Sequence, residues 1–168
     1  MLKKITVNKI MSWGPCYDKE YIQDIFKKHG KKFYTPLEIA KSGEKIDDIL
    51  WILLRPEIIS EMDLHELACK FAERALKRER KKGREPHIDS WNAIKVKRKW
   101  LKGKATDEEL SAAESAAWYA AESAARSAAW SAARSAAWYA ARSAESERKY
   151  QLKKVIKVLE KLEVNNES

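Results

Sequence analysis

The sequence has few of the residues that interrupt helices or form tight turns. It contains only five Gly and four Pro among 168 residues, and none of these follows Ala105. It also contains no Asn-Gly or Asp-Gly pair, the commonest signals of a two-residue β-hairpin. These absences argue against a β-sheet architecture. They predict an all-α protein, a single-domain bundle of six or seven helices.

Cysteine, glutamine and long apolar runs are scarce as well. The two cysteines, Cys16 and Cys69, are too few for a disulfide framework, and Gln occurs only twice in a Lys- and Glu-rich chain, which is typical of heat-adapted proteins. The longest apolar run, residues 49–54, is far shorter than the roughly 18 residues of a membrane span. The first residues, MLKKITVNKIM, lack the features of a signal peptide. We therefore expect a cytoplasmic protein without membrane contact.

Motifs of common enzyme and metal sites are missing too. We find no P-loop, no GxSxG elbow, no Rossmann glycine cluster and no CxxC or HExxH spacing. His65 and Cys69 are four residues apart on one predicted helix face and could supply half of a metal site, completed by Cys16 and His29. The competing interpretation, a cysteine that acts as a small buried apolar side chain, is the commoner one. We expect no enzymatic activity, no cofactor and no metal.

Positive charge is abundant and unevenly distributed. The net charge is +9, and residues 67–105 hold fourteen basic and four acidic side chains, whereas residues 37–66 hold three and eight. Such a basic segment is typical of electrostatic contact with nucleic acid, although Lys and Arg on an amphipathic helix also form ordinary solvated faces. Within residues 70–104, the candidate nucleic-acid contacts are Lys77, Arg78, Arg80, Lys81, Lys82 and Arg84.

Start and stop signals divide the chain into helices. Asp18 suits an N-cap, and Thr35-Pro36-Leu37-Glu38 combines an N-cap, proline at the first helical position and a capping-box glutamate. A second capping box, Thr106-Asp107-Glu108-Glu109, opens the last long segment. The helices expected before it cover residues 7–12, Asp18 to His29, a short stretch from Thr35, Lys45 to Leu54, Ser60 to the turn at Gly83, and Asp89 to Gly103.

An internal repeat dominates the C-terminal part of the chain. From Ser111 to Arg142 the sequence consists of eight x-Ala-Ala-x units. Alanine has the highest helix propensity, so we expect one long helix over residues 106–163, followed by a tail at 164–168. Residues 1–105 then form the region of shorter helices. A straight rod of this length would span about 85 Å, so a bend near residues 143–149 is the alternative.

The four-residue period rotates equivalent positions slowly around this helix. Four residues at 100° each exceed a full turn by about 40°, so the aromatic side chains emerge on several sides. We therefore expect neighbours all round the helix, either from its own domain or from another copy of the chain in a homo-oligomer. The predicted packing anchors are Trp118, Tyr119, Trp130, Trp138 and Tyr139.

Three blocks of sequence carry a resemblance to a known family. The segments ILWILLRPEII (49–59), LHELACKFAERAL (64–76) and WLKGKATDEELSAA (100–113), followed by the alanine tetrads, resemble an immunity-protein-like domain found in phage-associated and other bacterial proteins of unknown function. The resemblance covers roughly residues 5–160. It implies a helical fold and a role in neutralising a toxin, and it carries no set of functional residues.

Together these features favour a non-enzymatic protein-binding module, of immunity type and of phage or mobile-element origin, with a protein partner. One alternative is a nucleic-acid-binding accessory protein that uses residues 70–104. The other alternative is an oligomeric structural or assembly protein built on the tetrad helix.

Overall fold

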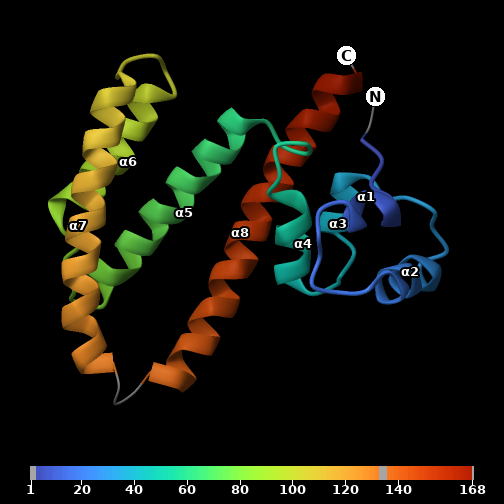
Figure 1. Cartoon of the computed structure of the whole chain (residues 1–168), viewed down its shortest axis with the longest axis horizontal. Helices are drawn as coiled ribbons and strands as arrows, with labels where there is room; N and C mark the ends of the chain where they lie inside the picture. The colour runs from blue at the N-terminus through green and yellow to red at the C-terminus, as the bar shows by residue number, and fades with distance from the viewer. Residues whose placement is uncertain (1–2, 133–135, 168) are drawn as a thin grey trace. The chain divides into compact units, whose positions relative to one another are not determined.

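A computed structural model describes the backbone of residues 3–132 and 136–167, and the side chains of residues 3–120 and 144–164. The all-α prediction is confirmed over these residues. They form eight helices, one more than expected, and their only β-type pairing is an isolated antiparallel bridge between Ile5 and Tyr34. The helices are α1 (Val7–Met11), α2 (Lys19–Lys28), α3 (Pro36–Ala40), α4 (Ile46–Leu53), α5 (Glu61–Lys81), α6 (Ile88–Trp100), α7 (Asp107–Ala132) and α8 (Ala136–Glu167) (Figure 1).

The chain divides into two compact units, where the sequence predicts a single domain. Unit 1 comprises Met1–Ser60 together with Glu147–Ser168, and unit 2 comprises Glu61–Ser146. Capping signals mark where each helix begins and ends, but they do not tell which helices pack together, and the last helix returns to the N-terminal segment.

Local side-chain chemistry sets the helix ends as predicted. The Asp18 carboxylate accepts a hydrogen bond from the Tyr21 amide at 2.8 Å and caps α2. Thr35 and Glu38 form a complete capping box, in which the Thr35 amide donates to the Glu38 carboxylate at 2.8 Å and the Glu38 amide donates to the Thr35 hydroxyl at 3.2 Å. After α2, Gly30 takes a φ of 63°, a conformation that favours glycine.

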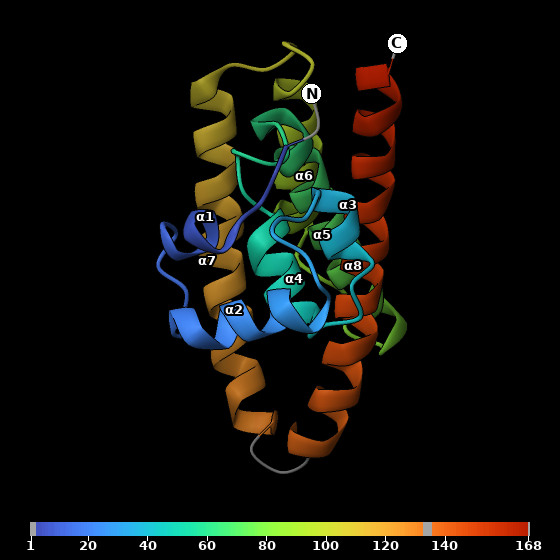
Figure 2. The same cartoon turned by 90° about the vertical axis from the view of Figure 1, so that its right-hand side faces the viewer.

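Unit 1 is built on buried aliphatic side chains. The C-terminal part of α8 lies beside α3 and α4 (Figures 1 and 2), where Lys41 pairs with Glu160 at 3.5 Å and Arg148 pairs with Asp47. The apolar stripe predicted for the end of the chain points inward, since Val155 and Leu159 are buried. The most completely buried side chains of this unit are Leu53, Ile59 and Val155.

In unit 2, α6 packs against both α5 and α7 (Figure 1). The second predicted capping box is confirmed, because the Thr106 amide donates to the Glu109 carboxylate at 2.8 Å and the Glu109 amide donates to the Thr106 hydroxyl at 3.1 Å. The helix that the sequence predicts from Asp89, with Asp89 as its cap, begins at Ile88 instead. His87 is the N-cap, and its Nδ1 accepts the Asp89 amide at 3.3 Å.

The alanine-rich segment is described as two helices, α7 and α8, where the sequence predicts one. Residues 133–135, between them, lie outside the described residues. α8 runs through residues 143–149 as one helix, and the alternative of a bend there stays a prediction. Trp118 and Tyr119 are 62% and 67% exposed, so they do not act as packing anchors within the chain. The other three predicted anchors, Trp130, Trp138 and Tyr139, lie outside the residues whose side chains are described.

Candidate anion-binding surface on α6

A hollow of about 390 Å³ lies within unit 2, along the second half of α6 and the turn that follows it. Its α6 side chains recur at three- and four-residue spacing, which places them on one face of the helix. The lining residues are Glu73, Trp91, Ile94, Lys95, Arg98, Lys99, Lys102 and Lys104. Five of these eight side chains are basic and one is acidic. We call this set the α6 basic surface.

Four lysines of the α6 basic surface are free to meet an anion. Among the described residues, no ion pair or side-chain hydrogen bond engages these four, and Lys95, Lys99, Lys102 and Lys104 are all exposed. Lys95 lies in the middle of α6, Lys99 in its last turn, and Lys102 and Lys104 in the turn that follows Trp100. The negative end of the helix dipole favours a cation at Lys99.

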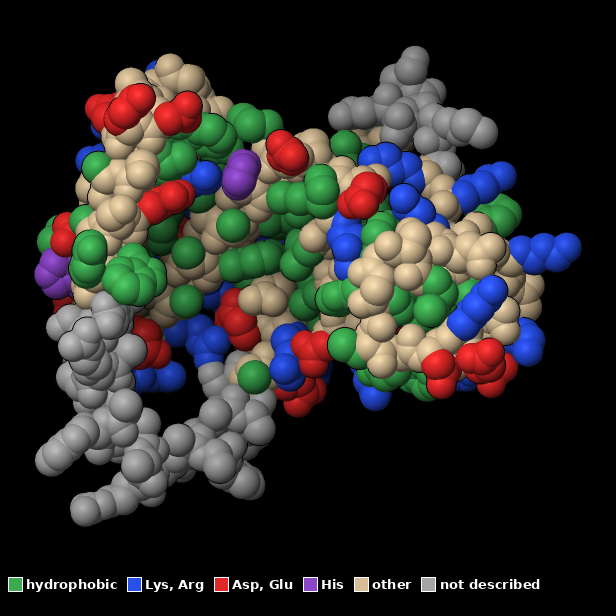
Figure 3. Space-filling view, viewed as in Figure 1, with side chains coloured by type: hydrophobic (Ala, Val, Ile, Leu, Met, Phe, Trp, Pro, Cys, Tyr) green, Lys and Arg blue, Asp and Glu red, His purple; other side chains and the backbone are tan. Residues whose placement is uncertain are grey.

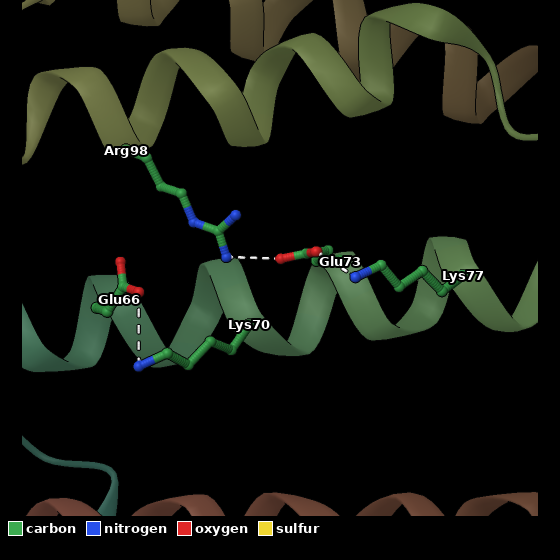
Figure 4. A network of polar contacts seen from close by, with 5 residues as sticks. All are labelled: Glu66, Lys70, Glu73, Lys77 and Arg98. Carbon is green, nitrogen blue, oxygen red and sulfur yellow. Dashed lines mark hydrogen bonds and ion pairs between the residues drawn. The ribbon is translucent and has the colours of Figure 1, made fainter.

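The single carboxylate in the hollow is already neutralised. Glu73 of α5 accepts hydrogen bonds from Lys77 at 2.5 Å and from Arg98 at 2.6 Å (Figure 4). The hydrogen bond from Lys77 and, to a smaller extent, that from Arg98 lower the pKa of Glu73 below its ordinary value. Because Glu73 stays ionised and doubly paired, it does not compete for the four lysines, and it holds Arg98 in place across the α5–α6 contact.

Trp91 lines the hollow, and its ring packs against the charged Arg80 side chain. The Arg80 guanidinium lies over the Trp91 ring, 4.6 Å from its centroid. The same guanidinium donates two hydrogen bonds to Glu85, from Nε at 2.8 Å and from Nη2 at 2.6 Å. Hydrogen bonding from Arg80 lowers the pKa of Glu85. Arg80 is thus a structural cation that stacks on Trp91.

The residues proposed from the sequence as nucleic-acid contacts lie mostly in ion pairs. Lys77 binds Glu73, Arg80 binds Glu85, and Lys82 and Arg84 both bind Glu79. Burial opposes ionisation of Glu79, but hydrogen bonds from Arg84 and Lys82 outweigh it and lower its pKa. Arg78 also interacts with another group of the chain, whereas Lys81 is exposed.

Figure 3 shows Lys and Arg interspersed with Asp and Glu on the visible face. Because many of these basic side chains form ion pairs, local charge density alone does not tell which of them can bind an anion. The basic segment predicted from the sequence, residues 70–104, contains the four lysines, but they lie ten to nineteen residues beyond its densest basic run, residues 77–85. The sequence signal that would have found them is a run without acidic residues, from Ala93 to Ala105. Within it, Lys95 and Lys99 have i, i+4 spacing, and Lys102 follows three residues later.

The residues weighed as metal ligands fall into different units. Cys16 and His29 belong to unit 1, and His65 and Cys69 belong to unit 2. The His65 ring packs edge-on against Trp100, with centroids 5.7 Å apart, and burial raises the pKa of the Cys69 thiol. Over the part of the chain that the structure describes, no three His, Cys, Asp or Glu side chains gather in a way that could hold a metal ion.

Within those same residues, no helix is both long and apolar enough to cross a membrane. Comparisons of the chain with protein-family models, with curated proteins and with solved structures gave no match. The resemblance to an immunity-protein-like domain therefore stays a prediction, and the functional argument rests on the side chains themselves.

Proposed function

We propose that this chain binds a nucleic acid through the α6 basic surface. The observation that carries the proposal is a cluster of four exposed lysines around one hollow, none of which forms an ion pair with a described residue: Lys95, Lys99, Lys102 and Lys104. A lysine ammonium is a compact charge that suits a phosphate oxygen, and contact with several phosphates releases condensed counterions. That release is the main source of sequence-independent affinity for nucleic acid.

The arrangement of the lysines favours a polymer over a single small anion. Lys95 and Lys99 are four residues apart on α6, about 6 Å along its axis, and Lys102 and Lys104 follow in the turn after the helix. A DNA duplex presents one negative charge per roughly 1.7 Å of its axis, so several phosphates can face this row at once. The hollow contains no cluster of Asn, Gln or Arg side chains aimed outward to read base edges, and phosphate contact alone carries no sequence information. We therefore expect binding that depends little on base sequence.

The direct test is a titration of a fluorescein-labelled duplex and of the same single strand with the full chain at low salt. Binding is measured by fluorescence anisotropy. The affinity should fall steeply as salt is added and change little when the base sequence is scrambled. A chain that fails to bind either oligonucleotide at low salt rejects the proposed function.

A second candidate is the protein-binding module that the sequence resemblance implies. One surface feature of unit 1 favours it. The Arg55 guanidinium lies between two indole rings, 4.7 Å from the Trp13 centroid and 4.0 Å from the Trp51 centroid, and Trp51 is 39% exposed. Trp and Arg are the residue types most enriched among the side chains that dominate binding energy at protein interfaces.

This second candidate predicts a specific protein partner in the native host. Affinity capture with the wild-type chain should recover a toxin whose activity the chain suppresses, and the Arg55→Ala variant should lose both recovery and suppression. The paired control is Arg84→Ala, which removes an arginine of unit 2 that is bound to Glu79. A toxin that both variants retain equally would contradict a role for this surface.

A further inference from the structure

Unit 1 contains a second hollow that the proposed function does not use. It is a cavity of about 310 Å³ that lies between α2 and α4. Apolar side chains of both helices form its walls, with Ile22, Ile25 and Phe26 from α2 and Ile49 and Ile52 from α4. For comparison, a cavity of about 150 Å³ lined by aliphatic side chains accommodates benzene. The volume in unit 1 is therefore sufficient for an apolar molecule of about two fused rings.

Polar contacts at both ends of the cavity hold its walls apart. At one end Tyr17 stacks on Tyr21, with ring centroids 4.6 Å apart, and donates a hydrogen bond to Asp48 at 3.3 Å. At the other end, the His29 ring lies 3.2 Å from the Glu44 carboxylate. These contacts connect the start and end of α2 to the residues around α4. They preserve the space between the two helices, which other side chains do not fill.

The charge of the cavity lining is opposite to that of the protein. The chain carries 34 Lys and Arg side chains and a net charge of +9. None of these cations lines the cavity, whereas three carboxylates, Glu44, Asp47 and Asp48, do. Glu44 pairs with Lys28 at 3.6 Å and with His29 at 3.2 Å, Asp47 pairs with Arg148, and Asp48 accepts a hydrogen bond from Tyr17. Each carboxylate keeps lone pairs for a further hydrogen bond. The lining therefore disfavours an anion and suits a cation.

The wall of the cavity also includes a buried hydroxyl group without a partner. Tyr34 is only 6% exposed, and its hydroxyl makes no hydrogen bond with the described residues. Burial raises the pKa of Tyr34. The positive charge of Lys31 opposes this rise, and the negative charges of Glu38 and Glu44 add to it. Tyr34 and Glu44, one of the three carboxylates, line the same cavity. Buried polar groups in proteins are nearly always paired, so this one indicates a missing partner.

We propose that the cavity of unit 1 binds a small amine with an apolar, two-ring-sized body, whose ammonium group lies between the Glu44 carboxylate and the Tyr34 hydroxyl. The apolar body fills the space between α2 and α4. The aromatic rings of Tyr17, Tyr21 and Trp51 also line the cavity and pack against the apolar body. This site is independent of the α6 basic surface and does not require the proposed nucleic-acid binding.

Three probes with the same ring system and different charge test the proposal. Tryptamine is a cation, tryptophol is neutral and indole-3-acetate is an anion. Isothermal titration of the wild-type chain should give binding in that order, with tryptamine about five- to ten-fold tighter than tryptophol and no detectable binding of indole-3-acetate. Equal binding of the three probes, preference for the anion, or no binding of tryptamine would each overturn the proposal.

Two variants then locate the site. Tyr34→Phe removes only the hydroxyl and should weaken tryptamine binding about three- to ten-fold, while Tyr119→Phe, at an exposed position of unit 2, should leave it unchanged. Thermal melts confirm that both variants are folded. Heteronuclear NMR of the wild-type chain provides a measurement that needs no variant: tryptamine should shift the amide signals of α2 and α4. Shifts confined to unit 2 would overturn the proposal.

Discussion

Removal of the four unpaired lysines should change the salt dependence of nucleic-acid binding by a calculable amount. The variant replaces Lys95, Lys99, Lys102 and Lys104 with Gln, which keeps side-chain length and helix propensity while removing four charges that no described group pairs with. Each phosphate contact contributes about 0.9 to the slope of log K against log salt for duplex DNA, so four contacts contribute about 3.6. Between about 50 and 200 mM salt, four such contacts alone weaken wild-type binding about 150-fold.

Fluorescence anisotropy of a labelled duplex, measured over a salt series, gives this slope directly. The matched control replaces four exposed lysines of unit 1, Lys32, Lys153, Lys157 and Lys161, which likewise have no ion-pair partner among the described residues. Both variants lose the same net charge. The slope of the α6 variant should be smaller than that of the wild type by about 3 to 4, and that of the control should change by less than about 1. Equal loss of slope in the two variants would refute the reasoning, because it would show that net charge acts without a defined surface.

Three further predictions concern the fold that positions this surface. Thr35→Ala removes the hydroxyl that caps α3 and should lower the free energy of unfolding by about 1 kcal/mol in a denaturant titration, whereas an unchanged midpoint would show that the capping box adds no stability. Glu73 has a lowered pKa in the folded chain, so it stabilises the fold above the ordinary carboxyl range and loses this contribution as the pH falls through the lowered pKa. Wild type should therefore be more stable than Glu73→Gln at neutral pH and lose that advantage in acid; a difference independent of pH would contradict the pairing with Lys77 and Arg98. Trp118→Ser should leave the melting temperature of the single chain nearly unchanged, because Trp118 is 62% exposed, and a large drop would show that its ring is packed.

Features that depend on neighbouring residues in the sequence could be predicted. The capping boxes at Thr35 and Thr106 each need only four consecutive residues, and both are present in the structure. The all-α class follows in the same way from helix propensity and the scarcity of Gly and Pro.

Features that depend on distant residues could not be predicted. Glu73 and Arg98 are 25 residues apart, and only their contact shows that the carboxylate in the α6 hollow is neutralised. The cavity of unit 1 needs the spatial arrangement of α2 and α4, which no sequence pattern specifies.

Lysine footprinting tests the central proposal most directly, because it reports contact at each side chain of the unaltered protein. The chain is acetylated briefly at low salt with and without a saturating duplex, and the reactivity of each lysine is measured by mass spectrometry. The proposal predicts strong protection of Lys95, Lys99, Lys102 and Lys104 by the duplex and little change at Lys153, Lys157 and Lys161 of α8. Unchanged reactivity of the four α6 lysines in the presence of bound duplex would contradict it.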